Sequence, residues 1–344
     1  MLLEGLHLPV TTPFYSDGRL NLRKLEHNVD RYSRTPASGI VVLSDIGEPS
    51  LLSDAETREA LSSAISLAAE SKVMLAGVSR ASVFSTLELA EFAATAGYDA
   101  VLVAAPTNLK SPEILLYLQA VSDRSPLPLV LYSTSAAPLP VELVATLAAH
   151  PRIIGLIDET ATSARMTQLL TATATVKHEV TVTPVFAAVT GRMLTAKDAQ
   201  APATFVSAET LGGGAAVATA PPKQAIKTRK KTVGFQIVTA NSANMLEGLR
   251  AGAIGAMPAF AASAPQAAYE VYAAWKDGDQ PLADIKQARI APAIEVVERE
   301  FGVPGIRYAS ELTGYFGGRP RLPALPLRGE ARGRVEQAMK GIRN

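Results

Sequence analysis

Eight short apolar segments, separated mostly by stretches of helical period, constrain this chain more than any other feature of its sequence. The segments are rich in Val, Ile and Leu, which is typical of parallel strands buried on both faces. The stretches between them place apolar residues at the three-and-four spacing of a helix that packs on a sheet. The strands are predicted at residues 6–12, 39–44, 72–79, 99–105, 128–132, 153–157, 233–239 and 252–257.

Two local signals mark helix ends within this pattern. Ser53 and Glu56 form a predicted capping box, in which each side chain satisfies a free backbone amide of the first helical turn. Gly97 is predicted to end the next helix, because glycine tolerates the left-handed conformation that closes many helices.

The repeated strand and helix units favour one closed (β/α)₈ barrel over residues 1–264. No glycine-rich fingerprint follows the first strand, as an open dinucleotide-binding sheet would require. Residues 265–344 are predicted to form a C-terminal helical region, with helices at about 265–277, 281–301, 305–314 and 329–341. Residues 171–231 are too long for a single connecting helix, and we interpret them as an insertion between strands six and seven.

Composition narrows the partners of such a barrel. Lys and Arg number 33 against 32 Asp and Glu, so no basic excess indicates nucleic-acid binding. The absence of cysteine excludes disulfides and thiolate chemistry. No apolar run is long enough for a membrane span, and the first residues lack a signal-peptide pattern. We therefore expect a cytoplasmic protein that binds a small molecule, with no membrane or nucleic-acid partner and no cofactor.

Several short motifs stand in a fixed order along the predicted barrel. They are Thr12-Pro13-Phe14 with Asp17-Gly18, Gly47-Glu48 with Leu52-Ser53 and Arg58, Leu131-Tyr132, Ile153-Ile154-Gly155-Leu156, and Phe301-Gly302-Val303-Pro304 through Leu322-Pro323. In this order and spacing the chain resembles the dihydrodipicolinate synthase and N-acetylneuraminate lyase family, over nearly its whole length outside the insertion.

The resemblance implies a lyase barrel whose active site lies at the carboxyl ends of the strands. In the family, a lysine at the end of strand six forms an imine with pyruvate, and a tyrosine at the end of strand five relays protons. The tyrosine corresponds to Tyr132, whereas the lysine position is occupied by Ile157. Because isoleucine cannot form an imine, the usual mechanism is not expected here.

Other positions also depart from the family pattern. The Thr-Thr pair that binds the pyruvate carboxylate is replaced by Asp45 and Ile46, and the tyrosines after strand four by Thr107 and Asn108. The arginine after strand five is replaced within residues 135–137. A lost arginine and a gained carboxylate each disfavour an anionic ligand by about 1 to 3 kcal/mol.

The candidate site is therefore a pocket for a small molecule at the C-terminal face of the barrel. Tyr132 is the candidate acid/base group, and Ile157 occupies the lysine position without being able to replace it. The candidate substrate-binding residues are Ser44, Asp45, Gly47, Glu48 and Thr107.

A metal ion and a lysine of the insertion are two further groups that could supply chemistry at this face. Asp45, Glu48, Asp158 and Glu159 could together hold a divalent cation. The alternation of strand six points Ile157 inward and Asp158 away, however, which favours caps and loop ligands instead. We predict no metal.

The insertion offers a second source, because its lysines could reach the barrel mouth and supply an amine. Such a basic cluster is more often a solvated surface. The lysines concerned are Lys223, Lys227, Lys230 and Lys231.

Two functions follow from these observations. The first is an aldolase-like carbon–carbon or carbon–oxygen lyase that acts on or binds a small carbonyl or hydroxy compound without a lysine imine, with the insertion as a lid. The second is a catalytically silent family member, a pseudoenzyme with a role in binding or assembly. The resemblance also implies a homo-oligomer.

Overall fold

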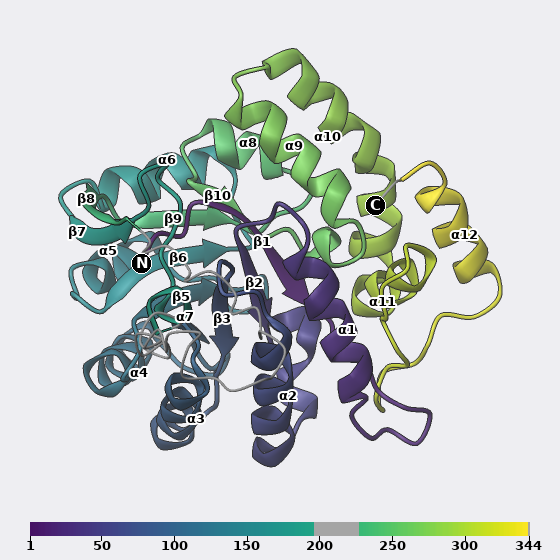
Figure 1. Cartoon of the computed structure of the whole chain (residues 1–344), viewed down its shortest axis with the longest axis horizontal. Helices are drawn as coiled ribbons and strands as arrows, with labels where there is room; N and C mark the ends of the chain where they lie inside the picture. The colour runs from purple at the N-terminus through teal and green to yellow at the C-terminus, as the bar shows by residue number, and fades with distance from the viewer. Residues whose placement is uncertain (196–226, 343–344) are drawn as a thin grey trace, which may run out of the picture.

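A closed barrel of eight parallel strands forms the centre of the molecule (Figure 1). The computed structural model describes residues 1–195 and 227–342. The strands follow the order β1-β10-β9-β6-β5-β4-β3-β2 around the barrel, and all neighbours are parallel. They are β1 Gly5–Val10, β2 Gly39–Val42, β3 Val73–Gly77, β4 Ala100–Ala104, β5 Leu129–Ser133, β6 Ile153–Asp158, β9 Gln236–Thr239 and β10 Gly255–Ala256. Each overlaps a predicted strand, so the predicted fold class is confirmed.

Helices surround the barrel and cover its outer face (Figure 1). The capping box is present at Ser53 and Glu56, and Gly97 ends its helix at a φ of 96°. Seven of them each follow a barrel strand: α1 Leu22–Ser33, α2 Asp54–Leu67, α3 Val83–Ala96, α4 Ser111–Arg124, α5 Val141–Ala148, α6 Ser163–Ala172 and α8 Met245–Arg250.

The inside of the barrel has its own apolar cluster, separate from the layer between strands and helices. Tyr132 and Ile157 both belong to it, and they are neighbours in the register of β5 and β6. Leu131 and Leu156, one residue before them, pack instead with the outer layer. The side-chain alternation of the two strands therefore turns Tyr132 and Ile157 into the barrel.

Gly155 lies at a close approach between β6 and β9. A Cβ atom added there would lie 2.5 Å from the Gln236 carbonyl oxygen and 2.8 Å from a methyl group of Leu3. Only glycine allows this distance, so Gly155 helps to set the register that carries Ile157 inward two residues later.

The C-terminal region adds four helices and one irregular turn. They are α9 Pro265–Lys276, α10 Gln280–Ile294, the π-helical turn Glu295–Glu300, α11 Gly302–Leu312 and α12 Glu330–Met339. Pro292 lies inside α10 just before the turn, and a proline removes one helical hydrogen bond. Within the residues described, no helix has the length and apolar character that a membrane crossing needs.

The described part of the insertion forms a two-stranded antiparallel sheet, β7 His178–Val182 with β8 Arg229–Val233, and the short helix α7 Gly191–Thr195. Val180 and Val182 pack on Leu2.

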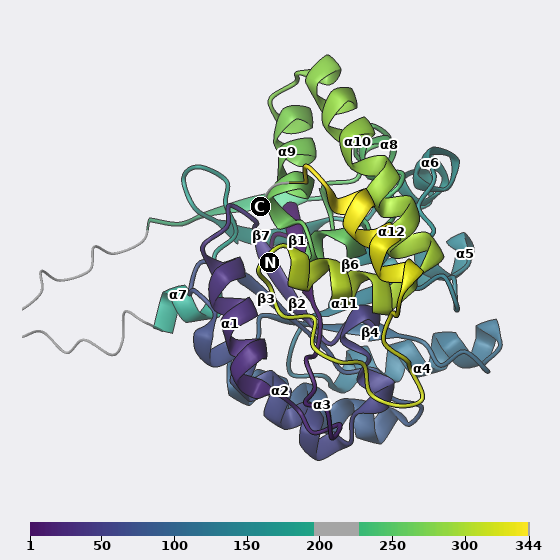
Figure 2. The ribbon, with the colours of Figure 1, turned by 90° about the vertical axis from the view of Figure 1, so that its right-hand side faces the viewer.

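This part of the insertion lies at the amino ends of the barrel strands. The Gly191 amide donates to Asp99, 3.1 Å away, just before β4, and Arg192 donates to the carbonyl groups of Ala68 and Ala69, which precede β3. Figure 2 shows α7 at the left edge of the described chain, whereas α12 lies to the right. The expectation of a lid over the mouth is therefore wrong for the described residues.

The insertion lysines do not reach the mouth within the described residues either. Lys230 forms an ion pair with Glu179 at 2.6 Å, and the Lys231 amine lies 4.7 Å from the centre of the Phe186 ring. Lys227 is exposed beside them. Lys223 lies outside the described residues.

The close approach at Gly155 yields a stability prediction. Gly155→Ala is expected to lower the free energy of unfolding by about 2 kcal/mol, because a rigid backbone carbonyl cannot move away from the new methyl group. The matched control is Gly333→Ala on the exposed face of α12, where nothing lies within 4 Å, and where alanine is expected to add about 0.5 kcal/mol. Urea unfolding measures both, and equal stability of the two variants would contradict the register of β6.

Candidate active site

Tyr132 and Glu159 form a hydrogen-bonded pair where β5 and β6 end. The Tyr132 hydroxyl donates to Oε1 of Glu159, and the Ser135 amide donates to Oε2 at 2.8 Å. Tyr132 is buried, and its pKa is raised well above the usual value, first by burial and then by the nearby carboxyl groups of Glu159 and Asp45. The hydroxyl therefore keeps its proton at neutral pH and can act as a donor.

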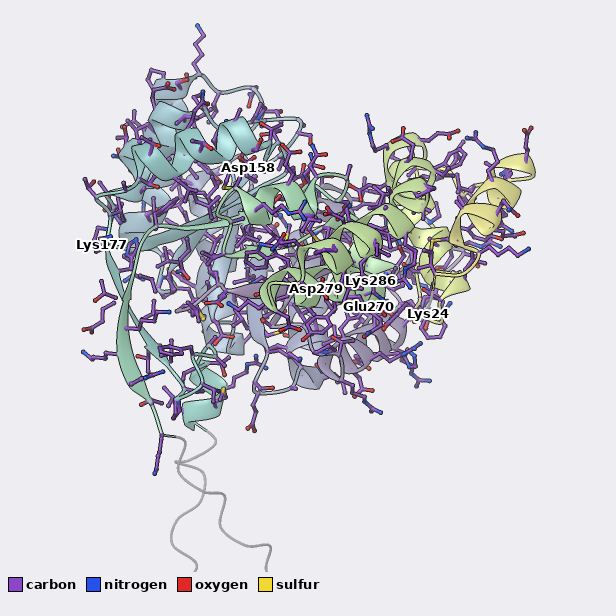
Figure 3. The ribbon with its side chains drawn as sticks, turned by 90° about the horizontal axis from the view of Figure 1, so that it is seen from above. Lys24, Asp158, Lys177, Glu270, Asp279 and Lys286 are labelled. Carbon is purple, nitrogen blue, oxygen red and sulfur yellow. The ribbon has the colours of Figure 1, made fainter. Side chains whose placement is uncertain are left out.

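The position of Glu159 follows from the chain just beyond β6. Asp158, labelled in Figure 3, is fully buried. It points away from the barrel and pairs with Arg165 at 2.6 Å. The next amide, that of Glu159, donates to the Ser133 carbonyl at 3.0 Å and so extends the pairing of the strands by one residue. The alternation then returns the Glu159 side chain to the side of Tyr132.

Asp45 supplies a second carboxyl group from the other side of the barrel. It begins the short 3₁₀ turn Asp45–Gly47 after β2 and is exposed at the rim. Partial removal from water and the Glu159 carboxylate raise the pKa of Asp45 to about 6. Asp45 is therefore partly protonated just below neutral pH.

Glu298 supplies a third carboxyl group, which the sequence reasoning did not identify. It lies in the π-helical turn, is half-buried, and accepts a hydrogen bond from the Phe260 amide at 3.0 Å. Burial raises its pKa to about 7, with a further contribution from Glu159. π-Helical turns inside α-helices often mark functional sites, but no residue pattern in the sequence predicts this one.

A cavity of about 390 Å³ opens between Glu159 and Glu298. Two asparagines and one arginine add hydrogen-bonding groups, and no lysine is among the described residues that line it. The lining residues are Ser135, Glu159, Ala240, Asn241, Ala243, Asn244, Ala259, Glu298 and Arg299. The Tyr132 hydroxyl reaches this lining through Glu159.

The remaining predicted site residues differ in their burial and in their hydrogen-bond partners. The Gly47 carbonyl accepts a hydrogen bond from the Thr12 hydroxyl at 2.7 Å, and Glu48 pairs with the buried guanidinium of Arg307. Within the described chain the buried Ser44 hydroxyl has no hydrogen-bond partner. Thr107 is exposed in the loop after β4.

The four acids considered for a metal site do not come together. Asp158 and Glu48 each pair with an arginine on different sides of the barrel, and of the four only Asp45 and Glu159 interact, through the effect of the Glu159 charge on the pKa of Asp45. Among residues 1–195 and 227–342, no group of three or more His, Asp or Glu side chains is placed to hold a metal ion. The carboxyl groups at the mouth are instead available for proton exchange and hydrogen bonding.

Fold and cavity together define an aldolase-like (β/α)₈ barrel with a C-terminal helical region. The family model described as "Dihydrodipicolinate synthetase family" matches residues 2–182 and 215–342. The chain belongs to the dihydrodipicolinate synthetase family.

Relatives and solved structures agree with this assignment. The chain is 25% identical over 346 residues to a 4-hydroxy-tetrahydrodipicolinate synthase of Acidiphilium cryptum, with 99% of each chain covered. It resembles a prophage protein of the dihydrodipicolinic acid synthase family from E. coli K12, solved in complex with pyruvate, with a TM-score of 0.76, 22% identity and 99% of each chain covered. For the Acinetobacter baumannii dihydrodipicolinate synthase complexed with pyruvate, the TM-score is 0.77 at 22% identity, over 99% of this chain and 100% of that one.

The raised pKa of Glu298 yields a prediction about stability and pH. Its pKa rises from 4.5 to about 7 on folding, so the folded state holds the proton more tightly, and the free energy of unfolding falls as pH increases between these values. Glu298→Gln removes the charged form. It is expected to stabilise the protein at pH 8 by about 2 kcal/mol more than at pH 5.

Urea unfolding at the two pH values measures this difference. Glu91→Gln, at an exposed position on α3, is the matched control and is expected to change stability equally at both pH values. A Glu298→Gln effect that does not depend on pH would show that this carboxyl group is not desolvated in the folded state.

Proposed function

We propose that this protein binds and transforms a small, uncharged carbonyl or hydroxy compound at the mouth of the barrel, as a lyase that does not use a lysine imine. The observation that carries the proposal is the Tyr132–Glu159 pair beside a cavity whose described lining includes no lysine, with Ile157 packed next to Tyr132 inside the barrel.

The charges around the cavity support an uncharged ligand. Glu159 and Glu298 line it and Asp45 lies beside Glu159, whereas Arg299, the cation of the lining, already pairs with Glu295 at 2.8 Å. A keto acid would bring its carboxylate towards three carboxyl groups, which costs free energy unless they take up protons. A hydroxyl or carbonyl group can instead share hydrogen bonds with the same oxygens and with the asparagine amides.

The Tyr132–Glu159 pair supports a proton-transfer step. A tyrosine hydroxyl with a raised pKa can donate a hydrogen bond to a carbonyl oxygen of the ligand, and the adjoining carboxylate can accept a proton from a ligand hydroxyl group. Within the described chain, Ser44 adds a buried hydroxyl without a partner near Asp45. Tyr132, Glu159, Ser44 and Asp45 are therefore the proposed functional residues.

A catalytically silent family member is the second candidate. Ile157 favours it, because an aliphatic side chain offers no electron sink for carbon–carbon bond cleavage. Glu48 also supports it. Its carboxylate was expected to contact substrate, but it forms an ion pair with the buried Arg307 and so has a structural role. Such a protein would keep the barrel and bind a ligand without turnover.

Scanning calorimetry with small probes tests the proposed class of ligand. Glyceraldehyde or dihydroxyacetone is expected to raise the melting temperature, because a ligand at a hundred times its Kd adds about 2.7 kcal/mol to stability. Pyruvate is expected to leave it unchanged at neutral pH. A shift with pyruvate and none with the uncharged probes would overturn the proposed ligand class.

Variants then test the Tyr132–Glu159 pair. Tyr132→Phe and Glu159→Gln are each expected to slow conversion of a bound probe, followed by NMR, by at least about a hundredfold. Glu91→Gln, at an exposed position on α3 that does not line the cavity, is the matched control. Binding without turnover in the wild type would favour the silent member, and equal rates in all variants would exclude the pair.

A further inference from the structure

A second hollow of about 750 Å³ lies away from the cavity between Glu159 and Glu298. The loop between β1 and α1, the start of α1, helix α11 and the tail before α12 form its walls, and Figure 1 shows these segments side by side. We call it the tail groove. Lys24, on α1, faces the C-terminal helices (Figure 3).

Most of the charged side chains that line the tail groove are cationic. Lys24, Arg319, Arg328 and Arg332 come from three separate segments of the chain. Among the described residues, none of the four forms an ion pair with a carboxylate. Lys24 lies 4.7 Å from the centre of the Phe316 ring, and Arg332 donates to the Leu327 carbonyl at 2.8 Å and stacks over Tyr308.

The two other charged residues of the lining are already engaged. Arg307 is buried and pairs with Glu48, while Glu311 accepts a hydrogen bond from the Gly318 amide at 2.9 Å. The local excess of positive charge is therefore about three, in a chain whose net charge is +1.

Two other arginines near this part of the chain are neutralised, by contrast. Arg321 and Arg334 belong to the same region, yet each pairs with a glutamate, Glu56 and Glu300 respectively. Four cations held around one hollow repel each other, and a bound anion removes that repulsion. Planar guanidinium groups also match the oxygens of phosphate and carboxylate groups with two hydrogen bonds each.

We propose that the tail groove is a binding site for a small multivalent anion, a molecule that carries at least two phosphate or carboxylate groups on a short skeleton. Several cations from different segments favour more than one anionic group. A compact ligand is favoured over one with a large aromatic ring, because Arg332 covers a face of Tyr308 and Arg307 and Arg321 lie over Phe14.

Isothermal titration calorimetry with the full chain and two probes, pyrophosphate and citrate, tests this site. At low ionic strength at least one probe is expected to bind with a Kd below about 1 mM, and at least tenfold more tightly than orthophosphate. Arg319→Gln/Arg328→Gln is expected to weaken the binding by at least about tenfold, because it removes two guanidinium groups that would form charge-assisted hydrogen bonds with the anion.

The matched control removes the same net charge elsewhere on the surface. Arg23 is exposed one residue before Lys24 and Lys110 is exposed beyond β4, and neither lines the tail groove. Arg23→Gln/Lys110→Gln is expected to change the Kd by less than about twofold. An equal loss in both double variants would show diffuse surface attraction and overturn the proposal, as would the absence of binding by both probes.

A further variant tests whether the anions bind in the tail groove or at the barrel mouth. Glu159→Gln is expected to leave pyrophosphate and citrate binding unchanged, because Glu159 lines the other cavity. Stronger binding of the anions in this variant would place them at the mouth and contradict the proposal.

Discussion

Strand β6 is held on both sides by backbone hydrogen bonds, to β5 and to β9, and the direction of each of its side chains follows from that pairing. Gly155 permits the close approach to β9, Ile157 then turns into the barrel, and Asp158 turns out to meet Arg165. Glu159 ends the alternation beside Tyr132. A shift of one residue would exchange the inner and outer sets and bury a carboxylate in the apolar interior.

Acidic side chains serve two different purposes around the mouth. Asp158 and Glu48 are neutralised by arginines and hold the loops and helices in place. Within the described residues Asp45 and Glu298 form no ion pair with an arginine, and their pKa values rise to about 6 and about 7 because they are partly removed from water near Glu159. Groups that exchange protons near neutral pH are those that acid/base chemistry requires.

The tail groove carries the opposite charge on a separate surface. The two hollows are linked by α11, whose Arg307 reaches Glu48 near the mouth while Tyr308 lines the groove. The two proposed ligands differ accordingly, with an uncharged compound at the mouth and an anion in the groove.

The barrel could be predicted from the sequence, because strand hydrophobicity and alternation are local properties. None of the residues predicted for the site lines the cavity between Glu159 and Glu298, although Tyr132 bonds to Glu159 at its edge. The same alternation correctly placed Ile157 inside and Asp158 outside. Glu298 was missed because it reaches the cavity only through a π-helical turn in a distant C-terminal helix. The pairing of Glu48 with Arg307 joins residues 259 positions apart, and no local pattern indicates it.

The insertion shows the same limit of local reasoning. Its length and basic run could be read from the sequence, but the end of the barrel that it covers depends on contacts such as those of Val180 with Leu2 and of Gly191 with Asp99. Those contacts place its described part at the amino ends of the strands. A lid was expected because functional loops are common at the other end.

Borohydride reduction in the presence of pyruvate, followed by mass spectrometry of the intact chain, tests the central claim about Ile157 most directly. Reduction traps any imine between a lysine and the keto acid as a stable adduct. The wild-type chain is expected to show no gain in mass, whereas Ile157→Lys provides an amine at the same position of β6 and is expected to gain one adduct. A covalent adduct on the wild-type chain, mapped to a lysine at the barrel mouth, would contradict the account. It would show that the protein forms an imine with pyruvate through another lysine.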